Sequence, residues 1–286
     1  EAYPEPVVQL LGEMTAAALL MQANIKFNGA LVLQILGDGP LKLAVVEVQP
    51  DFSVRSTAKI VGDIAADARL ADMVNVNNQG RCAITLDPKD RHPGQQPYQG
   101  IVPLFDDHGQ SLTTIASVLE HYMLQSEQLD TTLVLASNAQ MATGILVQRL
   151  PVMGENNLEG SRHGQANEDQ IGKNEDYNRI AHLTASLQQE ELLNLDVTHI
   201  LHRLYWNEPL RTFDALQGSE GPSFKCRCSR DRVSAMLVGL GEQEVHATMA
   251  QMGHIEVGCD FCGQNYRYDA IEAAQLFSDQ TIFTTV

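Results

Sequence analysis

Four cysteines near the end of the chain have the type and spacing of a metal site. One residue separates Cys226 from Cys228, and two residues separate Cys259 from Cys262. Residues 229–258 lie between the two pairs, which leaves room for two short helices and a turn. Short-spaced cysteine pairs around a small folded insert are typical of a tetrahedral zinc ion held by four thiolates. We therefore predict that these four residues bind one Zn²⁺ ion per chain.

The same spacing allows redox chemistry. Each cysteine pair can close on itself as a disulfide with little rearrangement, the first pair with more strain than the second. Positive charge beside the first pair favours thiolate, the form that binds metals and reacts with oxidants. These cations could equally serve only to balance the charge of a zinc tetrathiolate, and the two interpretations are compatible. The cations are Lys225, Arg227, Arg230 and Arg232.

Structural disulfides are the alternative to a zinc site. A disulfide scaffold of an exported protein carries many cysteines over a short length, whereas this chain has 5 in 286 residues. Low cysteine usage with a thiolate site favours a reducing compartment, and we expect a cytoplasmic location. The sequence opens at Glu1 without a methionine, so we also expect that an N-terminal segment is missing.

Composition and motifs exclude several classes of function. The net charge of −17 argues against a general nucleic-acid binder, which needs a basic face. No apolar stretch approaches the roughly 20 residues of a membrane span. A closed four-thiolate site has no open position for water, and we find no phosphate-binding loop, nucleophile elbow or HExxH motif. We therefore predict a protein that is not an enzyme and has no catalytic residues.

Other candidate residues are assigned structural roles. Cys82 lies within an expected strand, and we interpret it as a buried, inert thiol. Glu120 and His121 are adjacent on an expected helix and point in different directions, so we interpret both as surface or structural groups. Gly37-Asp38-Gly39-Pro40 is expected to be a turn whose glycines adopt positive φ. His254 is a weaker candidate ligand, because a structural site is complete with four ligands.

Hydrophobic periodicity predicts an α+β fold. An apolar helix rich in small residues is expected at 5–23 and a capped amphipathic helix at 111–128, with Ser111 as its cap. Leucine-rich helices begin at Tyr177 and must lie on the first domain or pair between chains. Two short helices, 231–240 and 242–252, and a final helix from Ala270 are expected near the cysteines. Strands are expected at 25–27, 31–36, 41–48, 53–61, 82–86, 97–102, 133–135, 144–147, 254–258 and 264–268.

These elements suggest three parts. Residues 1–151 form a mixed core of sheet and helices, and residues 152–218 form a polar segment and a helical linker. Within the second part, residues 153–176 have few apolar side chains and are expected to be mobile. Residues 219–286 form a small zinc domain with four cysteine ligands.

The small size of the last part predicts a switch. A domain of this length has too little apolar core to fold well alone. Zinc held by four thiolates typically supplies on the order of 10–16 kcal/mol of folding free energy, which is comparable with the roughly 5–15 kcal/mol of an ordinary small domain. Oxidation of the thiolates should therefore release zinc, unfold the domain and expose the leucine-rich linker helices, which would then bind other apolar surfaces.

The cysteine pattern and further segments resemble the 33 kDa chaperonin family, the redox-regulated heat-shock holdases of bacteria. The resemblance covers nearly the whole chain. The segments that carry it besides the cysteines are Lys26-Phe27-Asn28-Gly29, Leu36-Gly37-Asp38-Gly39-Pro40-Leu41, Tyr98-Gln99-Gly100-Ile101-Val102, Tyr122-Met123-Leu124-Gln125-Ser126-Glu127-Gln128-Leu129, Glu190-Glu191-Leu192-Leu193 and Leu201-His202-Arg203-Leu204-Tyr205.

The resemblance implies a cytoplasmic, ATP-independent chaperone that is inactive when reduced and zinc-bound. It implies Cys226, Cys228, Cys259 and Cys262 as zinc ligands, with disulfides Cys226–Cys228 and Cys259–Cys262 in the active form. It also implies unfolded client proteins as partners and a homodimer when active, with no nucleic acid or membrane. The sequence departs from the family in lacking the strand and helix expected before Glu1 and in the length of the polar segment.

Two other functions remain open. A zinc ribbon that binds nucleic acid would use the cations of the first cysteine pair, although the acidic remainder of the chain opposes it. A dithiol oxidoreductase would use Cys259 and Cys262, but such redox motifs normally accompany a βαβ unit, which is not evident here.

Overall fold

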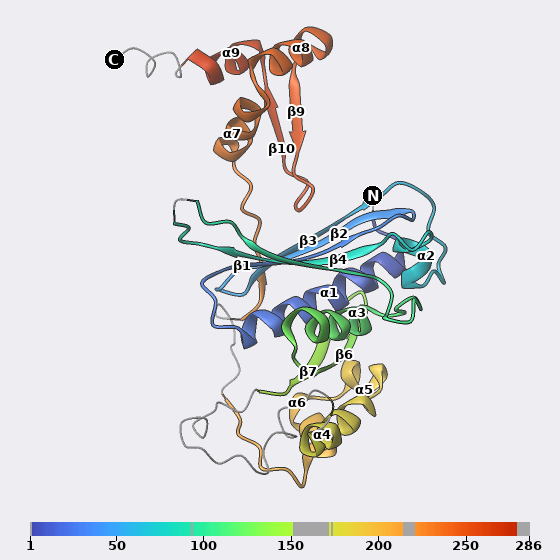
Figure 1. Cartoon of the computed structure of the whole chain (residues 1–286). Coiled ribbons are helices and arrows are strands. Elements are labelled where there is room, and N and C mark those ends of the chain that lie inside the picture. The colour runs from blue at the N-terminus through green and yellow to red at the C-terminus, as the bar shows by residue number, and fades with distance from the viewer. Residues whose placement is uncertain (1, 93, 151–171, 173, 214–220, 279–286) are drawn as a thin grey trace. The chain divides into compact units, whose positions relative to one another are not determined.

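The computed structural model describes residues 2–92, 94–150, 172, 174–213 and 221–278. The chain forms two compact units, residues 1–224 and residues 225–286, and each combines helices with β-strands (Figure 1). The predicted α+β class is therefore confirmed. The expected polar segment at 153–176 lies mostly outside the described residues, as do the predicted boundaries after residues 151 and 218.

A six-stranded sheet forms the centre of the first unit, in the order β5-β4-β1-β2-β3-β8. Neighbouring strands are antiparallel except β3 and β8, which are parallel. Alternate residues of β1 face the core, because successive side chains of a strand point to opposite faces. The strands are β1 (Gly29–Leu36), β2 (Leu41–Val48), β3 (Ser53–Ile60), β4 (Arg81–Pro88), β5 (Tyr98–Pro103) and β8 (Ser223–Phe224).

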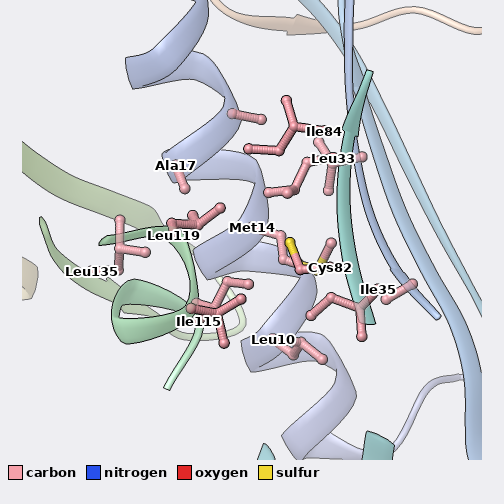
Figure 2. Packing of buried hydrophobic residues seen from close by; sticks show 14 of the residues in the cluster. Leu10, Met14, Ala17, Leu33, Ile35, Cys82, Ile84, Ile115, Leu119 and Leu135 are labelled. Atoms are coloured by element: carbon pink, nitrogen blue, oxygen red, sulfur yellow. The ribbon is translucent and has the colours of Figure 1, made fainter. Parts of the chain in front are cut away.

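Helix α1 (Glu5–Asn24) is buried between two layers. Leu33, Ile35 and Ile84 of the sheet contact one side of the helix, and α3 (Ile115–Tyr122) and β6 (Thr131–Ser137) lie on the other (Figure 2). Small and apolar residues on all sides of α1 suit a helix that is covered on both faces. The predicted helix at 5–23 and its burial are confirmed.

The leucine-rich helices lie on the hairpin of β6 and β7 (Ala142–Gln148) in the same unit (Figure 1). These linker helices are α4 (Glu175–Ala185), α5 (Gln189–Asn194) and α6 (Val197–Tyr205). Of the two predicted arrangements of these helices, packing on the first domain or pairing between chains, the structure shows the first. Their buried residues cluster with Ala136 of β6 and partly buried Val134 and Ile145, and are Leu187, Leu192, Ile200, Leu204 and Tyr205.

The second unit contains three helices and a hairpin among its described residues. They are α7 (Arg230–Leu240), α8 (Glu242–Met252), β9 (Ile255–Gly258), β10 (Asn265–Tyr268) and α9 (Ala270–Ser278). All were predicted within two residues. The buried core of this unit is small and consists of Val233, Leu237, Val245, Ile255, Tyr268 and Ala273.

Several local expectations were wrong. Residues 25–27 form no strand, because α1 continues to Asn24 and β1 begins only at Gly29. Ser111 does not cap α3; Thr114 does, through its side-chain oxygen, which accepts a hydrogen bond from Ser117 N at 3.1 Å. The helix then continues as a π-helix, η1 (Met123–Glu127). The short helix α2 (Leu70–Val74) was not predicted.

The turn at Gly37-Asp38-Gly39-Pro40 was predicted, but for the wrong reason. Neither glycine has positive φ. A Cβ on Gly37 would lie 2.0 Å from the carbonyl oxygen of Leu41, and one on Gly39 would lie 2.4 Å from that of Met73. Glycine is therefore needed here for close backbone approach. Across the described residues, no helix has the length and apolar character needed to cross a bilayer.

Candidate metal centre

The four predicted cysteines meet at one point of the second unit. Their sulfur atoms all lie within 4.8 Å of one another. The Sγ atoms of Cys226 and Cys259 are 3.6 Å apart, and those of Cys228 and Cys262 are 3.4 Å apart. Residues more than thirty positions apart in sequence therefore form a single thiol cluster.

Two short structural elements hold the pairs in place. Cys226 and Cys228 lie between β8 and α7, whose N-terminus is capped by the side chain of Ser229. Cys259 and Cys262 lie in the turn between β9 and β10. This turn is closed by hydrogen bonds from Cys259 N to Gln264 O at 2.9 Å and from Gly263 N to Cys259 O at 2.8 Å.

Glycine shapes this second turn. Gly263 has φ of +71°, a conformation in which residues with a side chain are strained. A Cβ on Gly258 would lie 3.0 Å from Asn265 Oδ1, so space is also limited on the other side of the pair. The conformation of this turn therefore requires glycine at position 263 and leaves little space for a side chain at position 258.

Neighbouring groups in the cluster shift the pKa values of Cys226 and Cys262 in opposite directions. Burial opposes ionisation of Cys226, but the Cys228 N–H and the neighbouring thiols outweigh it and lower its pKa to about 6. The Gln264 N–H favours the thiolate of Cys262, but the thiols of Cys228 and Cys226 outweigh this hydrogen bond and raise its pKa to about 12. The thiols thus share protons, and a bound cation would take the place of those protons.

Tyr266 is a site residue that the sequence analysis missed. Its hydroxyl donates a hydrogen bond to Cys228 Sγ at 3.1 Å. This hydrogen bond is the main cause that raises the pKa of Tyr266 to about 12, so the phenol stays protonated and keeps its donor. A donor to a ligand sulfur stabilises the thiolate form that a metal requires.

Arg230, one of the cations beside the first pair, has a clear structural role. Its Nη2 atom donates to Glu272 Oε1 at 2.6 Å and to Arg267 O at 3.0 Å, and its guanidinium lies 4.4 Å from the centre of the Tyr268 ring. Arg230 therefore connects the start of α7 to α9 and β10.

The geometry of the cluster fits a zinc ion. Zinc–sulfur bonds of about 2.3 Å in a tetrahedron place sulfur atoms about 3.8 Å apart. The observed separations are close to this value, and the cluster contains four thiols, the ligands that a closed structural zinc site uses. His254 lies outside the cluster and has Glu256 as its partner, with 3.8 Å between Nε2 and Oε2.

The remaining candidates have structural roles. Cys82 is fully buried in the first unit, and burial raises its pKa to about 12, as expected for an inert thiol. Glu120 accepts a hydrogen bond from Leu133 N at 2.7 Å and so connects α3 to β6.

Comparisons with known proteins match almost the whole chain. A family model described as "Hsp33 protein" matches residues 1–269. A protein of Chromobacterium violaceum named 33 kDa chaperonin is 45% identical over 276 residues, which cover 96% of this chain and 83% of the relative. A 33 kDa chaperonin of Methylobacillus flagellatus is 39% identical over 98% of this chain and 85% of its own length.

A solved structure shares the fold. The crystal structure of the 33 kDa chaperonin of Thermotoga maritima matches with a TM-score of 0.68 at 20% identity, and covers 96% of this chain and 87% of that chain.

Proposed function

Because this chain belongs to the Hsp33 protein family, we propose that it is a redox-regulated, ATP-independent chaperone that is inactive when reduced and zinc-bound. The family relatives are named chaperonins, which are not enzymes in the catalytic sense and act by binding unfolded chains. The observation that carries the redox part of the proposal is the thiol cluster, in which two self-closing cysteine pairs share one site.

In the reduced state, Cys226, Cys228, Cys259 and Cys262 are the proposed ligands of one zinc ion. The bound zinc supplies a crosslink between the two turns worth on the order of 10–16 kcal/mol of folding free energy. The second unit needs this contribution because, within residues 225–278, only six residues form its buried core. Tyr266 supports the cluster by its hydrogen bond to Cys228.

In the oxidised state, disulfides Cys226–Cys228 and Cys259–Cys262 are proposed to replace the metal. With hypochlorous acid, one thiolate of a pair attacks chlorine and forms a sulfenyl chloride with release of hydroxide. The second thiolate then displaces chloride and forms the S–S bond. Each disulfide thus consumes one oxidant, which accepts two electrons, and two oxidants remove all four ligands from the metal.

Loss of the ligands is proposed to unfold the second unit and weaken the linker helices. Strand β8, which pairs with β3 through only two residues, ends two residues before Cys226. The linker helices are short, and helices of this length are stable only through packing. Their release from β6 and β7 would expose the apolar cluster of Leu187, Leu192, Ile200, Leu204 and Tyr205, which is proposed to bind unfolding clients.

We further propose that the active form is a homodimer in the cytoplasm and that its partners are unfolded proteins. These points are supported by the family and by the acidic composition, which disfavours nucleic acid.

One experiment tests the switch. The zinc content, the number of free thiols and the suppression of aggregation of a heat-unfolded client are measured on the same samples before and after hypochlorous acid. We expect release of about one zinc per chain, loss of four thiols and the appearance of holdase activity, with reversal by dithiothreitol. Equal activity before and after oxidation would overturn the switch, and Cys82→Ala is the matched control because its thiol lies outside the cluster.

A further inference from the structure

A second site lies in the first unit, far in sequence from the thiol cluster. A cavity of about 110 Å³ opens between the C-terminal end of α1, the sheet, η1 and β7. For scale, a cavity of about 150 Å³ with apolar walls binds benzene, so this smaller cavity holds an aromatic ring only together with the space that the Tyr98 side chain occupies. Most of its lining is apolar and consists of Met21, Leu31, Ile84, Leu86, Leu129 and Leu146.

One end of this cavity has a buried hydroxyl group. Tyr122 lines the cavity and is 2% exposed, and its hydroxyl, although close to the Tyr98 phenol, has no partner with hydrogen-bond distance and angle among the described residues. The hydroxyl lies against Gly100, where an added Cβ would be 2.0 Å away. Phenylalanine would supply the same ring without the cost of an unpaired buried hydroxyl. The chain therefore retains a hydrogen-bond donor at this position together with the glycine that makes room for it.

The mouth of the cavity has an exposed tyrosine and a carboxylate acceptor. Tyr98 is 49% exposed and donates its hydroxyl to Glu127 Oε1 at 2.9 Å. Burial first, and then the nearby Tyr98, raise the pKa of Tyr122, so both phenols are neutral. Displacement of the Tyr98 side chain would therefore leave a donor, Tyr122, and an acceptor, Glu127, facing the same space.

The wall beside these groups has unusual backbone. Residues Met123–Glu127 form the π-helix η1, which ends at Gln128 with φ of +56°. π-Helical turns are rare and are frequent at functional sites. This turn carries Met123 and Glu127 to the cavity. The segments 98–102 and 122–129, which the zinc site does not use, thus meet here.

We propose that this cavity binds a small phenol. An aromatic ring fits the apolar walls, and the thioethers of Met21 and Met123 make favourable contacts with rings. The ligand hydroxyl accepts a hydrogen bond from Tyr122 and donates one to Glu127, replacing Tyr98. The cavity shares no residue with the thiol cluster. A result that refutes phenol binding would therefore leave the proposed redox function unaffected, and the reverse also holds.

Titration of the reduced, zinc-loaded full chain with p-cresol, followed by amide NMR shifts, tests this site. Toluene is the comparison ligand, because it has the same ring without the hydroxyl. We expect saturable shifts in η1 and β5, and a preference for p-cresol over toluene of about five- to tenfold, the effect of one neutral hydrogen bond.

Tyr122→Phe should abolish this preference while keeping binding of toluene. The matched control is Tyr205→Phe, another buried tyrosine, whose hydroxyl is paired with Thr184 at 2.6 Å. Equal binding of both ligands to the natural chain, shifts confined to other elements, or no saturable binding would overturn the proposal. Stronger binding by an acetylated Gly-Tyr-Gly amide than by p-cresol would also overturn it, because the occupant would then be a peptide side chain.

Discussion

At the scale of single residues, the chemistry of the chain divides between two kinds of thiol. Cys82 is fully buried with a pKa of about 12, whereas Cys226 in the cluster has a pKa of about 6. Thiolates, and not thiols, bind metals and react with oxidants. Cys226 is therefore the cluster thiol most readily ionised, whereas Cys82 is shielded by burial from metals and oxidants.

Substitution of a cluster cysteine should abolish zinc binding, whereas substitution of Cys82 should not. Cys259→Ser is expected to lower zinc content from about one to near zero per chain and to unfold residues 225–278, because a tetrahedral site is left with three thiolates. Cys82→Ala should keep full zinc content and lose only about 1 kcal/mol of stability, since it removes one buried sulfur. Atomic absorption and hydrogen exchange measure both effects, and full zinc occupancy in Cys259→Ser would contradict the assignment of ligands.

Zinc affinity should fall as pH falls. The raised pKa of Cys262, about 12, means that zinc must displace its proton throughout the neutral range, whereas Cys226 competes only below its pKa of about 6. Displacement of at least one proton gives a loss of at least about tenfold in affinity per pH unit between pH 8 and 6. Competition with a chromophoric chelator at each pH measures this slope, and a flat profile would count against thiol ligands.

A site residue can be predicted from sequence when the feature that defines it is local along the chain, and it is missed when its partner comes close only after folding. The cysteine pairs were found because the spacing within each pair is local in sequence. Tyr266 was missed because its hydroxyl reaches Cys228 only after β10 pairs with β9. The cavity at Tyr122 was missed for the same reason, since six separate segments form its walls.

At the scale of elements, the linker helices and β8 connect the proposed switch to the core. Periodicity predicted the helices because their buried leucines repeat along each helix. It placed the start of the helix before residue 115 wrongly, because Ser111 instead pairs with Phe105 in an isolated bridge. Strand β8 could not be predicted from two residues that depend on β3 for their pairing.

Weakening the linker packing should activate the reduced protein in part. Leu204→Ala removes a side chain that is 4% exposed and should destabilise docking by about 2–5 kcal/mol. Leu195→Ala, at a residue that is 41% exposed, is the matched control and should have little effect. Hydrogen exchange of residues 175–205 and client aggregation measure the result. Strong protection together with full inactivity in Leu204→Ala would show that these helices do not control activity.

Breaking the pairing of β8 should lower the oxidant needed for activation. Ser223 N donates to Phe52 O at 3.3 Å, and Ser223→Pro removes this N–H at a cost of about 1 kcal/mol. Ser223→Ala keeps the N–H and is the control. The hypochlorous acid concentration that gives half-maximal activity is expected to be lower for Ser223→Pro than for Ser223→Ala. Identical values would mean that β8 does not couple the oxidised unit to the core.

At the scale of the whole molecule, the two units differ in what stabilises them. The first unit has a continuous apolar core on both sides of α1 (Figure 2), and the described part of the second has an apolar cluster of six buried residues and a thiol cluster. Composition and length predicted this contrast, because a short segment with four cysteines needs a crosslink.

Removal of zinc under reducing conditions should unfold only one unit. With a strong chelator and dithiothreitol, residues 225–278 are expected to lose amide protection while α1 and the six-stranded sheet keep theirs. Hydrogen exchange with mass spectrometry reads both units in one sample, and added zinc should restore protection. Retained protection in α7, α8 and α9 without zinc would show that the second unit folds on its own core.

The complete shielding of Cys82 has a consequence for repeated use. In the described part of the first unit no cysteine is accessible, so under the proposed switch an oxidant would not crosslink this larger unit through a non-native disulfide. Under the proposed switch, recovery would therefore require only reduction of the two disulfides and rebinding of a metal ion, while the first unit stays folded throughout.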